Sequence, residues 1–305
     1  MIRRVTLLVG GLAAAAVLSS CSTFDTSAAA RVNGDTIDDS VVETLLAGDG
    51  TSDSTAGSAL DATQARIALS ELIQAAVANQ VADRYNIDLS AARAADQEQT
   101  KLNLTGERLT KWKALSQDER NLISDFQVAV DALRSAQADP PADLERRYRD
   151  PESTGFFCIR YISFETESAA AEANAKLRGG ADFATLADAV TGQQTGGVAS
   201  GPDNSACVGL DQFRPPNIPE PITAALFAAE PGVATDPIHV VGAQGQAWFI
   251  LLHRPWSEIS TDLTNKVAEA PVFAEFLAEI ARTKASVSSR YGVWDALSGS
   301  VVQHS

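Results

Sequence analysis

The stretch from Phe156 to His253 constrains the fold most, because apolar runs and helical patterns follow one another there in a regular order. FFCIRYISF at its start and AWFILLH at its end are rich in β-branched and aromatic residues, which predicts strands. Between them, helical patterns over Glu167–Leu177 and after Asp182 are separated by Gly179-Gly180, a typical left-handed helix end. A third short helix over Pro221–Ala229 and a strand over Val233–Val241 complete a small, self-contained domain.

The first 20 residues have the order of a targeting signal. Arg3 and Arg4 precede an apolar core over residues 5–17, which is too short for a stable transmembrane helix. Leu18-Ser-Ser-Cys21 then resembles the bacterial lipobox. We therefore expect cleavage before Cys21 and lipidation of this residue, which places the protein outside the cytoplasm on the bacterial cell membrane without spanning it. An ordinary signal peptide or an uncleaved anchor is the alternative.

Charge and cysteine content limit the kinds of function. The net charge is −15, and it becomes −17 without the first 20 residues, which hold two Arg and no acidic residue. Such acidity argues against a nucleic-acid partner. Besides Cys21 the chain has Cys158 and Cys207, which in an oxidising compartment predict a disulfide, with two free buried thiols as the alternative. No CxxC or HxxxH spacing occurs, so neither a metal site nor a cofactor is predicted.

The segment before the central stretch is predicted to be helical after a short hairpin. Asn33-Gly34 stands between apolar positions and predicts a tight turn. Helices are then predicted over Leu60–Tyr85, with Ile67 on the apolar face, and over Ser90–Leu115, with Leu102 on it. Ser116 and Glu119 form a capping box for a further helix. Past Pro255, the apolar positions of another helix share one face: Val272, Phe273, Phe276, Leu277 and Ile280.

Two sets of motifs in this order resemble a known family. LRGGADFATLA, PEPITAALF and EPGVATDPI resemble the parvulin-type peptidyl-prolyl isomerase domain. The lipobox, the Val-Asn-Gly hairpin and the closing helix resemble the SurA and PrsA group of envelope foldases. The resemblance covers residues 30–295 and implies an α+β fold, in which a SurA-like helical domain made from both ends of the chain carries an inserted parvulin-like domain of antiparallel sheet and short helices.

The implied division of the chain is a signal peptide over 1–20, a tether over 21–30, the helical domain over 31–150, the parvulin-like domain over 151–256, and a C-terminal helix and tail over 257–305 that complete the helical domain.

The resemblance also implies a pocket. The parvulin pattern has a histidine in its first strand and another in its last strand, and these positions fall here on Tyr161 and on Ala247 or Trp248, so both histidines are missing. The polar position at the end of the glycine-rich loop falls on Asn204 or Cys207. We take Tyr161 and Asn204 as the candidate catalytic residues. The candidate proline-binding wall is Ile218, Ile222, Phe227 and Trp248.

His239 and His253 lie at other strand positions, where we expect them to be exposed to solvent. Prolyl isomerisation breaks no covalent bond and needs an apolar pocket that favours the twisted amide, so loss of the histidines is expected to weaken or abolish activity without abolishing proline binding. Tyr161 can still donate one hydrogen bond. A disulfide between Cys158 and Cys207 would hold the glycine-rich loop beside this pocket.

The sequence thus predicts an envelope foldase or chaperone that binds unfolded secreted polypeptides, with peptidyl-prolyl isomerase activity as an open question. The alternative is a non-catalytic interaction module for one dedicated envelope partner. Cys207 as a catalytic thiol would need to be free and to have a partner base, and the sequence offers no motif for one.

Overall fold

The computed structural model describes residues 27–46, 59–150, 154–191, 207–213, 218–242, 245–296 and 298–304. The predicted signal peptide, Cys21, most of the tether and Asn204 lie outside these ranges. Within them, no helix is long and apolar enough to span a membrane.

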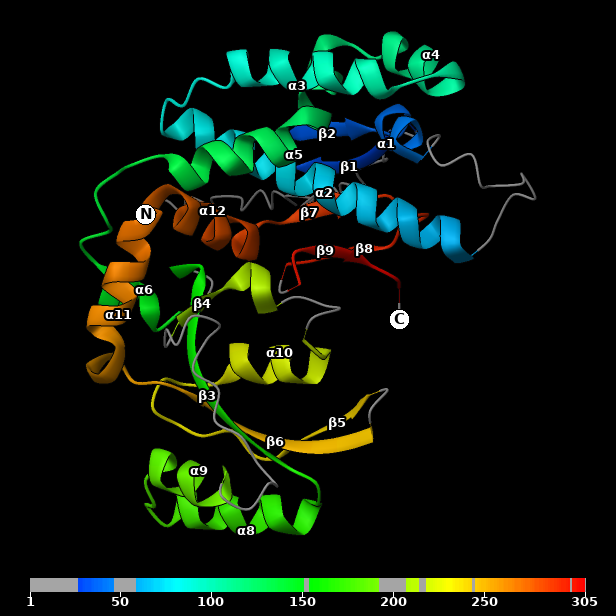
Figure 1. The fold of residues 1–305 in the computed structure, drawn as a ribbon. Coiled ribbons are helices and arrows are strands. Elements are labelled where there is room, and N and C mark those ends of the chain that lie inside the picture. The colour runs from blue at the N-terminus through cyan, green and yellow to red at the C-terminus, as the bar shows by residue number, and fades with distance from the viewer. Residues whose placement is uncertain are drawn as a thin grey trace, which may run out of the picture.

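Two segments far apart in the sequence form a helical part, at the top of Figure 1. Its N-terminal elements are β1 (Ala28–Val32), β2 (Asp35–Asp38), α1 (Asp39–Leu46), α2 (Ala59–Arg84), α3 (Ser90–Asn103), α4 (Gly106–Ala114) and α5 (Gln117–Ser135). Its C-terminal elements are α12 (Pro271–Arg282), β7 (Ala285–Val287), β8 (Val293–Asp295) and β9 (Ser300–Val302). β7 pairs with β1 in a sheet of order β2-β1-β7, so the C-terminal segment completes this part.

The core of the helical part lies between α2, α5 and α12. Apolar residues of α2 pack there against Leu133 of α5 and against Phe276 and Ile280 of α12, and all three are buried. The predicted apolar face of α12 is confirmed, since Val272, Phe276, Leu277 and Ile280 are buried and Phe273 packs against the same cluster.

The sheet part is inserted between these segments and lies in the lower half of Figure 1. Its elements are β3 (Phe156–Phe164), α8 (Glu167–Arg178), α9 (Phe183–Thr191), β4 (Cys207–Gly209), a 3-10 helix (Leu210–Phe213), α10 (Glu220–Ala228), β5 (Ile238–Gly242) and β6 (Gly245–His253). All pairings in its sheet are antiparallel, in the order β4-β3-β6-β5. The helices α6 (Leu144–Tyr148) and α11 (Trp256–Glu269) lie where the chain enters and leaves it. The fold is therefore α+β, as predicted.

The two faces of this sheet are covered by different helices because side chains alternate along a strand. Phe157, Ile159 and Tyr161 of β3 share an apolar cluster with α10. Ile162 and Phe164 point to the other face and pack with α8 and α9. The two central strands, β3 and β6, are thus apolar on both faces, which is why their sequences read as nearly continuous apolar runs.

Several local predictions are confirmed. Asn33 and Gly34 have φ values of 51° and 105° and connect β1 to β2. The Ser116 side chain accepts from the Glu119 N–H, and the Glu119 side chain accepts from the Ser116 N–H, as a capping box requires. The Asp182 carboxylate accepts from the Thr185 N–H at 2.8 Å at the start of α9.

Two predictions about helices are wrong. The single helix predicted over Ser90–Leu115 is divided into α3 and α4, because Leu104 is extended and Gly106 has a φ of +55°. Ile67 and Leu102 were expected on apolar faces, yet they are 48% and 77% exposed. Helical spacing alone does not show whether a neighbouring element covers a given face.

Candidate functional site

Tyr161 of β3 and Phe249 of β6 lie together on the face of the sheet that α10 covers. β3 pairs with β6 so that Tyr161 is opposite Leu251, and Phe249 is therefore its diagonal neighbour on the same face. The two rings are 6.0 Å apart between centroids and meet edge to face. The Tyr161 hydroxyl has no hydrogen-bond partner among the described residues, so it is a free donor on an otherwise apolar surface.

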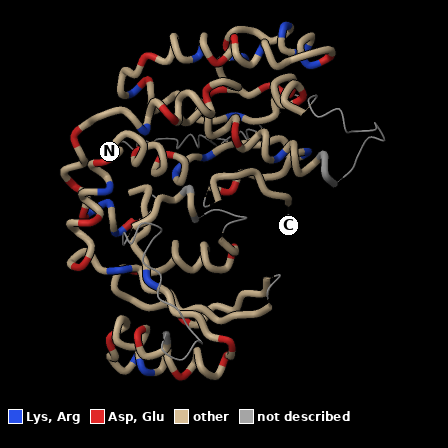
Figure 2. Tube along the Cα trace, in the orientation of Figure 1, with Lys and Arg blue, Asp and Glu red and all other residues tan. Residues whose placement is uncertain are grey.

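An apolar wall surrounds this aromatic pair. Ile222 of α10 is 8% exposed, whereas Ile218, Phe227 and Tyr161 are only partly buried, and all four belong to one cluster. The Phe227 ring meets the buried Phe157 ring edge to face at 4.8 Å, which fixes α10 on the sheet. Figure 2 shows that α10 and β6 carry few charged residues, while α3 and α4 at the top and α8 at the bottom carry several.

The structure thus brings together four of the residues that the sequence singled out: Tyr161, Ile218, Ile222 and Phe227. Trp248 lies on the opposite face of β6, in the cluster with Ile162, and its ring stacks on the exposed His239 ring at 4.4 Å. Of the two positions considered for the last strand, Ala247 shares the face of Tyr161 by alternation. Asn204 lies outside the described residues.

Phe249 is the site residue that sequence reasoning missed. It belongs to the apolar cluster of Tyr161 and its ring meets the Tyr161 ring, whereas no contact between Tyr161 and Ala247 or Trp248 is seen. Alternation along β6 already places Ala247 and Phe249 on one face and Trp248 on the other. The pairing of β3 with β6, which sequence alone did not supply, would have completed the assignment.

The predicted disulfide between Cys158 and Cys207 is confirmed. These residues are directly opposite each other on β3 and β4, and their Cα atoms are 3.9 Å apart. Both are buried among apolar residues of α6 and α11, so the thiol alternatives are excluded. The bridge holds the first residue of β4 against β3.

His253 is buried, which corrects the expectation that it faces solvent. The residue is 0% exposed, and its ring lies 4.8 Å from the Tyr148 ring and 5.8 Å from the Phe157 ring. Its Nδ1 is 3.4 Å from the Ala229 carbonyl oxygen, and its Nε2 has no partner among the described residues. Burial lowers the pKa of His253 below its usual value. The end of β6 is covered because the chain after α10 and the helix α6 both fold over it.

Among the described residues, no group of three His, Cys, Asp or Glu side chains is arranged to hold a metal ion. Within the described ranges, the site consists of one aromatic pair, one free hydroxyl and the apolar wall. In the described part of the chain this surface is mostly apolar, which suits it to holding an apolar group.

These features define the chain as an α+β protein in which a small antiparallel-sheet part with an apolar site is inserted into a helical part. No protein-family model matches the chain, and no curated protein matches it. Among solved structures, the chain is similar to the foldase PrsA.

Three PrsA structures illustrate this similarity. PrsA from Bacillus subtilis is 14% identical, with a TM-score of 0.27 over 72% of this chain and 83% of that one. PrsA from Streptococcus pneumoniae is 16% identical, with a TM-score of 0.26 over 81% and 88%. PrsA from Lactococcus lactis is 11% identical, with a TM-score of 0.23 over 86% and 94%. Identities and TM-scores this low say nothing about a shared activity.

Proposed function

We propose that this protein is a lipid-anchored, extracytoplasmic foldase of the parvulin type that binds unfolded secreted polypeptides through the face of its sheet part that carries Tyr161. The observation that carries the proposal is the apolar wall of Ile218, Ile222 and Phe227 beside the free hydroxyl of Tyr161. Cys21 and the 20 residues before it support the anchor and the location.

The proposal follows from what such a surface offers to a polypeptide. A proline ring or another apolar side chain loses contact with water against Ile222 and the Phe249 ring, which favours binding by about 25 cal/mol per Å² of apolar surface buried. The Tyr161 hydroxyl can donate one hydrogen bond to a carbonyl oxygen of the bound segment. One donor and an apolar wall select apolar segments without selecting a particular sequence, as a foldase with many clients requires.

Because the described site has one polar group and is otherwise apolar, we expect slow or no prolyl isomerisation. The transition state is a twisted amide, and only interactions stronger there than in the ground state accelerate the reaction. Phe249 has no polar atom, so it adds apolar contact and no hydrogen bond to the twisted amide. Tyr161 remains as the single polar group of the described site.

A refolding assay tests this function. The full-length protein is added to a substrate whose slow phase is prolyl isomerisation, first in catalytic and then in stoichiometric amounts. At stoichiometric amounts we expect a higher yield of refolded substrate. Ile222→Ala should lose this gain, because the substitution shortens a side chain of the wall. At catalytic amounts we expect little acceleration of the slow refolding phase. Ile67→Ala is the matched control, since it makes the same change at an exposed position of α2.

The assay also separates the alternatives. Marked acceleration at catalytic amounts that disappears in Tyr161→Phe would establish an active isomerase, because that variant removes only the hydroxyl. If neither rate nor yield changes, the foldase proposal is wrong and the dedicated interaction module takes its place.

A further inference from the structure

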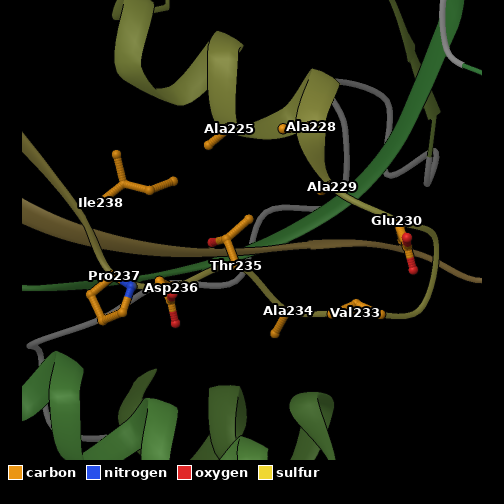
Figure 3. Close-up of a pocket in the computed structure, with 10 residues that line it drawn as sticks. All are labelled: Ala225, Ala228, Ala229, Glu230, Val233, Ala234, Thr235, Asp236, Pro237 and Ile238. Carbon is orange, nitrogen blue, oxygen red and sulfur yellow. The ribbon is translucent and has the colours of Figure 1, made fainter.

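A groove lies on the flank of α10, next to the wall around Tyr161, since its lining residues Ala225 and Ile238 belong to the same apolar cluster. Its volume is about 460 Å³, and its upper side in Figure 3 is formed by Ala225, Ala228 and Ala229 at the C-terminal end of α10. The segment Val233–Ile238 forms the opposite side. No residue of β3 or β6 lines it, so the groove lies beyond the edge of the sheet and not over its centre.

The segment that forms the lower side is a sheet edge that pairs with β6 on one side only. The Thr235 N–H donates to the Leu251 carbonyl of β6 at 2.8 Å, and Ala234 forms a bridge with Leu252. Backbone groups of successive residues on a strand point to opposite edges, so Ala234 turns its N–H and C=O away from β6. Neither these groups nor the Asp236 N–H has a partner within the described part of the chain.

The free stretch of this edge is short and runs over Ala234–Asp236. It ends at Pro237, which has no N–H to offer a further strand, and the register with β6 shifts by one residue between the Ala234–Leu252 pair and the Ile238–Phe249 pair.

The small side chains of α10 leave room beside this edge. Ala225, Ala228 and Ala229 end at Cβ, so a chain lying along Ala234–Asp236 has space for one aliphatic side chain between the edge and the helix. Strand addition of this kind takes its affinity from main-chain hydrogen bonds and its selectivity from a pocket for alternate side chains.

The rim of the groove is acidic. Glu230 lines it, is exposed, and has no ion-pair partner among the described residues. Asp236 is also exposed but is already bonded to Asn174 and Arg178. A carboxylate at the end of an apolar groove favours a cationic side chain next to the aliphatic one.

We propose that this groove, formed by α10 and the segment Val233–Ile238, is a second polypeptide-binding site that takes an extended segment of alternating aliphatic and basic residues as an added strand. The site goes beyond the function proposed above, and its lining includes none of the wall residues Ile218, Ile222 and Phe227. A chain with a proline at the one site and an aliphatic–basic stretch at the other would be held at two points.

The test measures binding of a fluorescein-labelled seven-residue peptide of alternating lysine and valine to the full-length protein by fluorescence anisotropy. We expect saturable binding that is about tenfold weaker in Ala228→Leu, because the larger side chain fills the groove. Glu230→Gln is expected to weaken it about threefold, the usual effect of one exposed ion pair. A peptide N-methylated at alternate residues is expected to bind at least about tenfold more weakly, because it cannot pair with the edge.

Matched controls keep the test specific. Ala224→Leu and Glu220→Gln make the same changes at exposed positions of α10 outside the groove and are expected to bind as the unmodified protein does. Ile222→Ala is expected to lose the refolding effect and keep peptide binding, and Ala228→Leu to do the reverse. The second site would be overturned if the peptide did not bind, or if Ala228→Leu or the methylated peptide bound with full affinity. Loss of peptide binding in Ile222→Ala would also overturn it.

Discussion

Burial determines the charge state of His253, the last residue of β6. In the folded protein this ring lies beside Tyr148, Phe157 and the Ala229 carbonyl, its Nε2 is buried, and this burial lowers its pKa from 6.5. In the unfolded chain the ring keeps its ordinary pKa, so below pH 6.5 the unfolded state binds more protons than the folded state does. The free energy of unfolding should therefore be highest above this pH and fall as the pH decreases from there toward the folded pKa.

We predict that His253→Phe removes this part of the pH dependence. The unmodified protein should lose up to about 1.4 kcal/mol of unfolding free energy per pH unit below 6.5 through this one group. The variant keeps an aromatic ring but cannot take up a proton, so its urea denaturation midpoint should depend less on pH in that range. His239→Phe makes the same replacement at the exposed histidine of β5 and is the matched control. An equal slope in His253→Phe and in the unmodified protein would contradict the prediction.

Asp125 of α5 is the second residue whose surroundings allow a sharp prediction. It is 0% exposed, and its carboxylate accepts from Arg93 Nε at 2.5 Å and from Asn79 Nδ2, which joins α5 to α3 and α2. Asp125→Ala leaves the half-buried Arg93 without its carboxylate partner, and only the Asn79 side-chain oxygen still accepts from it. We expect the free energy of unfolding to fall by about 3 kcal/mol. Asp131→Ala on the same helix, where the ion pair with Arg134 is exposed, should change little in the same urea titration.

At the scale of elements, the start of β3 depends on a glycine. Gly155 has a φ of +71°, and a Cβ atom there would lie 2.5 Å from the Ala274 carbonyl oxygen and 2.8 Å from Leu277 Cβ, both in α12. Gly155→Ala therefore adds backbone strain and an overlap with a helix backbone, which should cost about 3 kcal/mol of unfolding free energy. Gly180→Ala is the matched control, since its φ is +91° but nothing lies within 4 Å, so only the strain of about 1 kcal/mol should appear in thermal unfolding. Equal losses would show that α12 does not restrict this turn.

Elements that are determined locally could be predicted from the sequence, and those that depend on distant neighbours could not. Asn33-Gly34 and the pair Ser116 and Glu119 specify a turn and a helix start by themselves, and both are present. The break before Gly106 also has a local signal, but the flanking helical spacing concealed it. The exposure of Leu102 depends on what packs beside α3, and no periodicity within the helix carries that information.

The candidate site shows the same limit. The resemblance to the parvulin pocket pattern was enough to select Tyr161, Ile222 and Phe227, which lie in one cluster. The residue of β6 whose ring meets Tyr161 is Phe249, and its identification needs the register between two strands that are far apart in the sequence. A shift of one residue moves a side chain to the other face, which is why Trp248 was grouped with residues from which the sheet separates it.

At the scale of the whole molecule, the two parts are joined along α6, α11 and α12. Tyr148 of α6 donates from its hydroxyl to the Arg254 carbonyl at 2.6 Å, which holds the entry to the sheet part against its exit. Arg147 Nη1 lies 2.8 Å from Glu275 Oε2 of α12, so the same short helix is also paired with the helical part. The cystine lies between these contacts, in one cluster with Tyr148 and with Ile259 of α11.

Removal of the cystine should therefore weaken the sheet part and its junction more than the helical core. The bridge closes a loop with a sequence separation of 49, for which chain entropy gives a stabilisation of about 4 kcal/mol. The test uses the double variant Cys158→Ala, Cys207→Ala. Fluorescence of the Trp256 ring, which packs against this cluster, should report unfolding of the sheet part and its junction. Far-UV circular dichroism should report mainly the helical part and should change at a higher urea concentration. The fluorescence is read in a background with phenylalanine at the other three tryptophans.

The unmodified protein in reducing agent should behave like the double variant, and the double variant should not respond to reducing agent at all. If the urea midpoints from Trp256 fluorescence and from circular dichroism shift by the same amount, the two parts unfold as one unit despite their separate cores. Two signals that separate would show that the inserted sheet part can open while the helical part stays folded, which would let the groove beside α10 and the wall around Tyr161 release a bound chain together.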